Sequence, residues 1–248
     1  MCGIAGLYLR RPAAEDALRA RAEAMAAAIA HRGPDGGGVW SEPDAGLALA
    51  HRRLAVIDLS EGGAQPMSSA CGRYVVSYNG ELYNYRELRD ELAQAGHRVR
   101  GESDTAVLVA ALAAWGVEAA LPRLDAMFAF ALWDRSERTL WLARDHAGIK
   151  PLAWARLDDG TILFGSELGA LEASGLLDGT LDPEAVALFL RHACVPAPRT
   201  ILRGVRKLPP GGVVRIGPGG EPAERRWFDM LALARGTAPA ALAPAEAA

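Results

Sequence analysis

Short apolar runs and amphipathic stretches alternate along most of the chain. Apolar residues at helical spacing predict helices over residues 13–30, 85–95, 104–115, 167–173 and 183–192. Short apolar runs bounded by turn residues predict strands over residues 4–9, 47–50, 54–57, 74–78, 127–133, 139–143, 152–155 and 162–164. Because helices are mixed with antiparallel strand pairs, the pattern favours an α+β layered domain over a doubly wound parallel sheet.

Local signals mark where several of these elements begin and end. Asp182 stands at the N-cap position of the last predicted helix and Pro183 at its first helical position, and both residue types favour a helix start. Residues 31–38 contain Gly and Pro and end in three glycines, which predicts a loop whose glycine run forms a flexible rim. Asn79-Gly80 is a turn signal at a strand end.

The balance of charges excludes several classes of partner. The chain has 27 basic and 30 acidic side chains and a formal net charge of −3, whereas a nucleic-acid or anionic-membrane surface needs clustered Lys and Arg. No apolar stretch approaches the roughly 20 residues of a membrane span, and the first residues lack the pattern of a signal peptide. We therefore expect neither nucleic acid nor membrane as a partner, and a cytoplasmic location.

Three cysteines, Cys2, Cys71 and Cys194, stand far apart in the sequence. Their odd number and their spacing predict neither a disulfide framework nor a metal site, and a reducing cytosol fits them. The five histidines show no metal-ligand spacing either. We therefore expect no metal site.

Cys2 is the sharpest local feature, because it follows the initiator Met1 directly. A small second residue permits removal of Met1, which leaves a free α-amino group on the residue that carries the thiol. Reference pKa values are about 7.7–8.0 for such an amine and about 8.5 for a thiol, so the amine can accept the thiol proton near neutral pH. One residue would thus supply both nucleophile and base, while the competing interpretation is an ordinary small buried residue.

Other residue types that amide hydrolysis needs are present as well. Asn79 offers a side-chain amide and Gly80 a backbone N–H for a developing oxyanion, although Asn-Gly alone is more often a hairpin turn. Arg53 suits a carboxylate because its planar fork binds bidentately. Asp104 and Glu81 suit an α-ammonium group, although each alone could equally be a surface residue.

Together these residues belong to a series of motifs that resembles the glutaminase domain of class II, N-terminal nucleophile glutamine amidotransferases, in the version found in glutamine-hydrolysing asparagine synthetases. The match covers about residues 2–216, and its motifs occur in the family's order. They are Cys2-Gly3-Ile4-Ala5-Gly6, His31-Arg32-Gly33-Pro34-Asp35, Arg53-Leu54-Ala55-Val56-Ile57-Asp58, Asn79-Gly80-Glu81-Leu82-Tyr83-Asn84, Ser103-Asp104-Thr105, Met127-Phe128-Ala129-Phe130-Ala131 and Arg144-Asp145-His146-Ala147-Gly148-Ile149-Lys150-Pro151-Leu152.

The resemblance implies a four-layer αββα sandwich of the N-terminal nucleophile hydrolase type. It implies that Cys2 is the nucleophile and that Asn79 and Gly80 form the oxyanion hole. The reaction would hydrolyse the side-chain amide of glutamine to glutamate and ammonia through a γ-glutamyl thioester on Cys2. The alternative is a non-catalytic glutamine-binding or docking module left from a truncated amidotransferase.

The resemblance also implies how glutamine is held. Arg53 would bind its carboxylate, and Asp104 and Glu81 its amino group. The backbone that would line the substrate slot comprises Leu54, Ala55, Val56 and Ile57.

The Ser-Gly-Gly-x-Asp-Ser loop of the ATP-dependent synthetase domain of this family does not occur in the 248 residues. Asparagine formation is therefore expected to need a synthetase domain in cis or in trans, with ATP and Mg²⁺ required there and no cofactor required for glutamine hydrolysis. Aspartate is the ammonia acceptor by resemblance, and a homodimer stays open. Residues 217–248, rich in Ala and Pro past Trp227, are expected to form a disordered linker or tail.

Overall fold

Two antiparallel sheets form the centre of the computed structural model, which describes residues 1–56, 60–219 and 221–236. The first sheet has the order β10-β8-β9-β1-β3-β2, with β1 (Gly3–Tyr8), β2 (Gly36–Glu42), β3 (Leu47–Arg53), β8 (Ala153–Arg156), β9 (Ile162–Gly165) and β10 (Val205–Lys207). The second has the order β12-β11-β7-β6-β5-β4, with β4 (Met67–Ser68), β5 (Tyr74–Leu82), β6 (Ala126–Asp134), β7 (Thr139–Arg144), β11 (Gly212–Ile216) and β12 (Ala223–Arg226).

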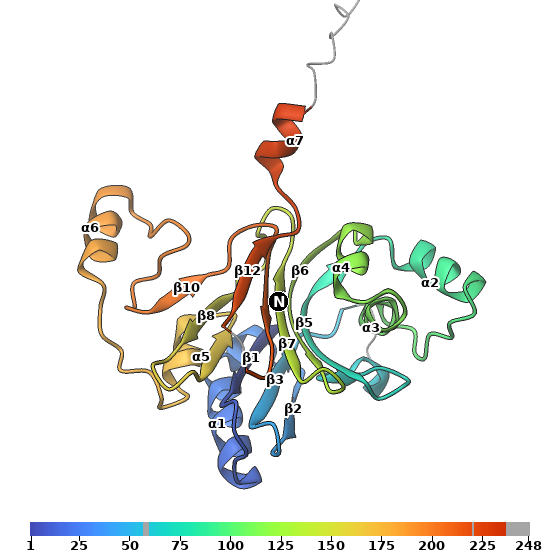
Figure 1. Cartoon of the computed structure of the whole chain (residues 1–248), viewed down its shortest axis with the longest axis horizontal. Coiled ribbons are helices and arrows are strands. Elements are labelled where there is room, and N and C mark those ends of the chain that lie inside the picture. Colours follow the sequence, from blue (N-terminus) through green and yellow to red (C-terminus); the bar gives the residue numbers. More distant parts are fainter. Residues whose placement is uncertain (57–59, 220, 237–248) are drawn as a thin grey trace, which may run out of the picture.

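Helices cover the outer face of each sheet, so the layers run α, β, β, α (Figure 1). On the first sheet lie α1 (Glu15–Ala28) and α5 (Leu168–Glu172); on the second lie α2 (Tyr85–Gln94), α3 (Asp104–Trp115) and α4 (Val117–Ala120). Two further helices, α6 (Pro183–His192) and α7 (Met230–Gly236), project from the body (Figure 1). The α+β four-layer sandwich predicted from the sequence is confirmed.

Three apolar layers hold these elements together. Between the sheets, Trp133 of β6 packs with its ring centroid 5.3 Å from that of Tyr8 of β1. On α1, Leu18, Ala22 and Met25 are buried against the first sheet, which is the helical spacing that predicted the helix. Because β6 is buried on both faces, its sequence is a continuous apolar run instead of an alternating one.

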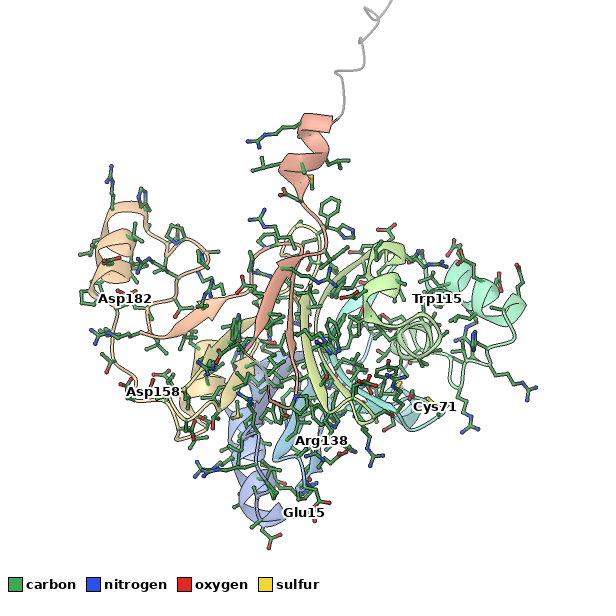
Figure 2. The ribbon with its side chains drawn as sticks, viewed as in Figure 1. Glu15, Cys71, Trp115, Arg138, Asp158 and Asp182 are labelled. Atoms are coloured by element: carbon green, nitrogen blue, oxygen red, sulfur yellow. The ribbon has the colours of Figure 1, made fainter. Side chains whose placement is uncertain are left out.

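Most predicted elements are found within a few residues of their expected ends. Asp182 caps α6 as predicted, since its side chain accepts a hydrogen bond from the Glu184 N–H at 3.0 Å. Figure 2 shows Asp182 at the start of this projecting helix. No helix within the described residues is long and apolar enough to cross a membrane.

The predicted loop over the three glycines at residues 36–38 is wrong. These residues begin β2 and pair with β3 in regular register. Close approach of other backbone explains two of the three glycines, because a Cβ on Gly38 would lie 2.5 Å from the Gln65 carbonyl oxygen and one on Gly37 2.9 Å from that of His51. A run that looks flexible in sequence is therefore a regularly paired edge strand.

Two further predictions of local structure also fail. The expected turn at Asn79-Gly80 lies inside β5, whose nine residues all pair with β6, so extended pairing overrides the local turn preference. The strand expected over residues 54–57 is not found over residues 54–56. There β3 ends at Arg53, and Val56 is 71% exposed. Ile57 lies outside the described residues.

Residues 221–236 differ from the disordered tail that was expected over residues 217–248. Residues 223–226 form β12, which pairs with β11. The sequence predicted neither strand. Trp227 follows, with its indole N–H donating to the Arg144 carbonyl at 3.0 Å and its ring stacked near Phe128. These contacts attach the segment to the second sheet, whereas residues 237–248 lie outside the described part of the chain.

Candidate active site

A cavity of about 240 Å³ opens beside the N-terminus. It is lined by Met1, Cys2, Arg53, Leu54, Ala55, Val56, Gly63, Gln65, Tyr78, Asn79, Gly80, Glu81, Ser103, Asp104, Thr105, Met127 and Lys150. Every site residue predicted from the sequence and described in the structure lies in this lining. Side chains from the start of β1, the end of β3, the middle of β5 and the first turn of α3 are thus brought to one place.

Cys2 is held from two sides. Its thiol lies beside Leu54, with the Leu54 N–H donating to Sγ at 3.4 Å and Sγ lying 3.5 Å from the Leu54 carbonyl oxygen. Its own carbonyl accepts a hydrogen bond from Nε of Arg32 at 3.0 Å. The sulfur of Cys2 is therefore held beside Leu54, and the backbone of Cys2 is held by Arg32.

The anchor on Cys2 continues into an ion pair. Nη1 of Arg32 donates to the Glu167 carboxylate at 2.8 Å, and Nε2 of His31 lies 3.0 Å from the same oxygen. Burial alone would raise the pKa of Glu167, but the hydrogen bonds and charges of Arg32 and His31 outweigh burial and lower it. Gly3 leaves room for this arrangement, because a Cβ there would lie 3.2 Å from Cδ of Arg32.

Asn79 lines the cavity and carries a hydrogen-bond donor that is unpaired among the described residues. The residue is 1% exposed, and within the described parts of the chain its Nδ2 has no hydrogen-bond partner. Leaving a buried donor unpaired costs on the order of 1–3 kcal/mol, so such a group marks a place where a substrate oxygen can be bound. Asn79 belongs to the same lining as Cys2.

The backbone of Gly80 adds a second donor. In an antiparallel ladder alternate residues turn their N–H groups away from the neighbouring strand. The N–H groups of Tyr78 and Leu82, two positions to either side, donate away from β6 to Gln65 Oε1 at 2.7 Å and to Asp104 Oδ2 at 3.0 Å. The Gly80 N–H points the same way, into the cavity that Gln65 and Asp104 line.

Gly80→Ala is expected to unfold more easily and to lose the amide hydrolysis that the sequence predicts. The added Cβ would lie 2.5 Å from the Met127 carbonyl oxygen and 2.6 Å from the Tyr78 ring, and such overpacking costs about 1–3 kcal/mol. Urea denaturation measures the effect. Gly169→Ala is the matched control, since a Cβ there meets nothing within 4 Å, and it should leave stability unchanged or raise it by about 0.5–1 kcal/mol.

Asp104 places a carboxylate at the N-terminus of α3, where the helix dipole favours negative charge. Its oxygens accept hydrogen bonds from the N–H groups of Leu82 at 3.0 Å and Thr105 at 2.8 Å. Burial nevertheless raises the pKa of Asp104 above its ordinary value, and the nearby charge of Glu81 adds to the rise. A cationic group in the cavity would relieve this penalty, which suits the α-ammonium of an amino acid.

The raised pKa of Asp104 predicts a pH-dependent KM. As pH falls, Asp104 becomes neutral at a pH above the ordinary aspartate value of 3.8, so KM for glutamine, the substrate expected from the sequence, should rise on the acid side. Asp104→Asn should raise KM about 10- to 100-fold at neutral pH, in line with loss of a hydrogen bond to a charged group, and should flatten the acid rise. Steady-state kinetics from pH 4.5 to 8 measure both, with the exposed Asp178→Asn as control.

The segment after β3 forms the floor of the cavity. Asp35 holds it, since its carboxylate accepts a hydrogen bond from the Ala55 N–H at 2.9 Å and its own N–H donates to the Arg53 carbonyl at 3.1 Å. The Arg53 guanidinium donates to the Ser60 carbonyl at 2.7 Å. It lies against Gly63, where a Cβ would be 2.3 Å from Nη2.

Buried polar residues that the sequence did not single out fasten the two sheets behind the site. Ser77 donates to the Ala50 carbonyl at 2.9 Å, and Nε2 of His51 lies 3.0 Å from the Tyr78 carbonyl oxygen. Burial lowers the pKa of His51 to about 4, so the ring is neutral at physiological pH. Because both residues lie in apolar strand surroundings, only their contacts across the sheets reveal their role.

The remaining cysteines lie apart from this site. Cys71 and Cys194 are exposed, and Figure 2 shows Cys71 away from the centre of the molecule. Across the described ranges no group of three or more His, Cys, Asp or Glu side chains could hold a metal ion.

The fold is shared with a solved glutamine amidotransferase. Glutamine phosphoribosylpyrophosphate amidotransferase of Bacillus subtilis superposes with a TM-score of 0.66 over 91% of this chain and 49% of that one, at 20% sequence identity. Identity this low shows the fold alone.

The chain belongs to the family of glutamine amidotransferase domains, whose family model matches residues 1–228. It is 37% identical over 229 residues to glutamine-hydrolysing asparagine synthetase 1 of Bacillus subtilis, covering 92% of this chain and 35% of that protein. It is 36% identical over 172 residues to asparagine synthetase B of Escherichia coli, covering 69% of this chain and 30% of that protein. The chain thus spans about a third of the length of these relatives.

Proposed function

We propose that this chain hydrolyses the side-chain amide of glutamine to glutamate and ammonia, with Cys2 as nucleophile once Met1 is removed. One observation carries the proposal: Cys2 and Asn79, whose buried Nδ2 has no partner among the described residues, line the same cavity. Membership of the glutamine amidotransferase domain family supports the choice of substrate.

The steps follow from the groups in the cavity. The α-amine of Cys2 takes the thiol proton, Sγ attacks the amide carbon, and the oxyanion receives hydrogen bonds from Asn79 Nδ2 and the Gly80 N–H. The C–N bond breaks as the amine passes its proton to the leaving nitrogen, which departs as ammonia. Water then attacks the γ-glutamyl thioester, giving its proton to the amine, and glutamate and the free thiol are released.

The ends of glutamine would be held by charge. Arg53 would pair with the α-carboxylate, while Asp104 and Glu81 would face the α-ammonium. The backbone of residues 54–56 would line the slot for the aliphatic part, with Ile57 assigned there by family resemblance. This hydrolysis would need no cofactor, because the thiol and amine of Cys2 supply nucleophile and base.

Labelling with a glutamine-mimicking diazoketone tests the proposal. A processed chain that begins at Cys2 should gain one adduct, which mass spectrometry should place on Cys2, and should release ammonia from glutamine. A non-catalytic glutamine-binding or docking module would instead show no ammonia release. Release of ammonia from a chain whose Cys2 stays unmodified would contradict the assigned nucleophile.

The use of the ammonia follows from the relatives. Two relatives are named as glutamine-hydrolysing asparagine synthetases, so we extend the proposal to asparagine biosynthesis, with aspartate as acceptor and an ATP- and Mg²⁺-dependent synthetase domain in cis or in trans. A cytoplasmic location fits these substrates. Adding a separate synthetase domain with aspartate and ATP should yield asparagine, and unchanged aspartate would exclude this acceptor.

A further inference from the structure

The loop after β7 is built around one buried carboxylate. Asp145 is 1% exposed and accepts hydrogen bonds from four backbone N–H groups. The donors, at distances between 2.9 and 3.1 Å, are the N–H groups of Phe128, Ala147, Ile149 and Lys150. Charge-assisted bonds of this kind are strong, so this carboxylate fixes the path of the loop up to Lys150.

Arg144 fixes the same loop from the other side. Its guanidinium donates to three carbonyl oxygens, those of Lys150 at 2.7 Å, Gly148 at 2.6 Å and Leu208 at 2.5 Å. Asp145 and Arg144 thus hold Lys150 by its N–H and its carbonyl respectively. The motif from Arg144 to Lys150 has no part in the proposed reaction. Its hydrogen bonds fix the backbone position of Lys150.

The side chain of Lys150 ends in the same cavity as Cys2. Lys150 is 5% exposed, and its Nζ lies 3.2 Å from Sδ of Met1. A thioether sulfur is a weak acceptor and carries no charge. Removal of Met1 takes this partner away and leaves the ammonium in the cavity that Cys2 lines.

Other charged groups also face Cys2. Those that line the cavity with it are Arg53, Glu81, Asp104 and Lys150, while Arg32 binds its carbonyl and Glu167 binds Arg32. Tyr78 stays neutral, because burial raises its pKa well above the ordinary value. In the proposed reaction the carboxylate of glutamine offsets Arg53 and its ammonium offsets one of the two cavity carboxylates, so Lys150 is the cation that balances the other carboxylate beside Cys2.

We propose that Lys150 is a positioning residue that keeps the α-amine of Cys2 neutral and favours its thiolate. The proposal rests on the assigned role of Cys2. A neighbouring positive charge disfavours a protonated amine and favours an ionised thiol, so both effects extend the reactive state to lower pH. Glu81 and Asp104 act in the opposite direction when the cavity holds no substrate, and Lys150 counters them.

The test removes the charge while keeping the length of the side chain. Lys150→Met in the full chain, with Met1 removed and its absence verified by mass, is compared with Lys150→Arg and with Lys207→Met. Lys150 and Lys207 are the two lysines among the 27 basic residues. Lys207 is a matched control because its Nζ donates to the Val195 carbonyl at 2.6 Å and does not line the cavity.

Two pH profiles are measured for each variant. One is kcat/KM for glutamine, and the other is the rate of alkylation of Cys2 by iodoacetamide, followed on the Cys2 peptide by mass spectrometry. Lys150→Met should move the acid limb and the alkylation midpoint up by about half to one pH unit, the size of a single unscreened neighbouring charge. Lys150→Arg and Lys207→Met should leave both profiles in place.

The outcomes separate this proposal from the proposed function. An alkylation midpoint that does not move in Lys150→Met, or that moves equally in Lys150→Arg, overturns the role of Lys150. Alkylation needs no turnover, so the result stands even for a variant that does not hydrolyse glutamine. A wild-type chain that releases no ammonia would instead refute the proposed reaction. The alkylation midpoints would still decide whether Lys150 favours the thiolate of Cys2.

Discussion

Retention of Met1 is expected to lower kcat for glutamine hydrolysis about 10³-fold, within the 10²–10⁴ range of a positioned general base. While Met1 is present, the nitrogen of Cys2 belongs to a peptide bond and cannot accept the thiol proton. Met1 also lines the cavity and contacts Lys150 at 3.2 Å, so it occupies space beside the thiol. Blocking the amine therefore removes the base without removing the nucleophile.

A chain with a cleavable N-terminal extension measures this effect. Activity is assayed before and after a protease exposes Cys2, with Cys2→Ala as the inactive reference. Iodoacetamide should still alkylate Cys2 in the uncleaved chain, which shows that the thiol remains accessible. Equal kcat before and after cleavage would show that the base is a different group and would remove the basis of the mechanism.

The site was predictable because its residues occur in ordered local motifs. Cys2, Arg53, Asn79, Gly80 and Asp104 each belong to a short stretch whose order resembles one family, and the structure gathers all of them around one cavity. Single-residue arguments were weaker, since Asn79-Gly80 alone indicated a turn. The fold corrected that interpretation, because β5 continues through both residues in register with β6.

The contacts that support the site were not predictable from local patterns. Arg32 binds the Cys2 carbonyl, and Asp35 binds the Ala55 N–H across 20 positions of sequence. His51 and Ser77 connect the sheets across 27 positions each. Such partners depend on sheet order and register, which hydrophobic spacing does not specify.

The glycine run at residues 36–38 also shows that local sequence does not specify which groups lie beside a residue in the fold. Glycine in sequence signals conformational freedom, and residues 36–38 were therefore expected to form a flexible rim. In the fold, Gly37 and Gly38 serve as strand residues that let backbone approach closely. Steric need and conformational freedom select the same residue type, so the neighbours in space decide between them.

Asn79→Ala is expected to lower kcat for glutamine hydrolysis about 10²- to 10³-fold, which corresponds to about 2.7–4 kcal/mol of transition-state stabilisation. The Nδ2 donor is buried and lacks a partner among the described residues, and Asn79 lines the cavity together with Cys2. Because the donor acts on charge that develops only in the transition state, KM should change little. Alanine also removes an unpaired buried donor, so the free energy of unfolding should not fall as it would for a paired asparagine.

Asn84→Ala provides the matched control five positions along the chain. Its amide is fully engaged outside the cavity, since Nδ2 donates to the Arg123 carbonyl at 2.9 Å and Oδ1 accepts from the Asp125 N–H at 3.1 Å. This variant should lose about 1–3 kcal/mol of stability by urea denaturation and keep its kcat. The pair thus predicts opposite outcomes, activity lost at Asn79 and stability lost at Asn84. If Asn79→Ala lost stability and kept its kcat, the side chain would be a structural hydrogen-bond donor and no part of an oxyanion hole.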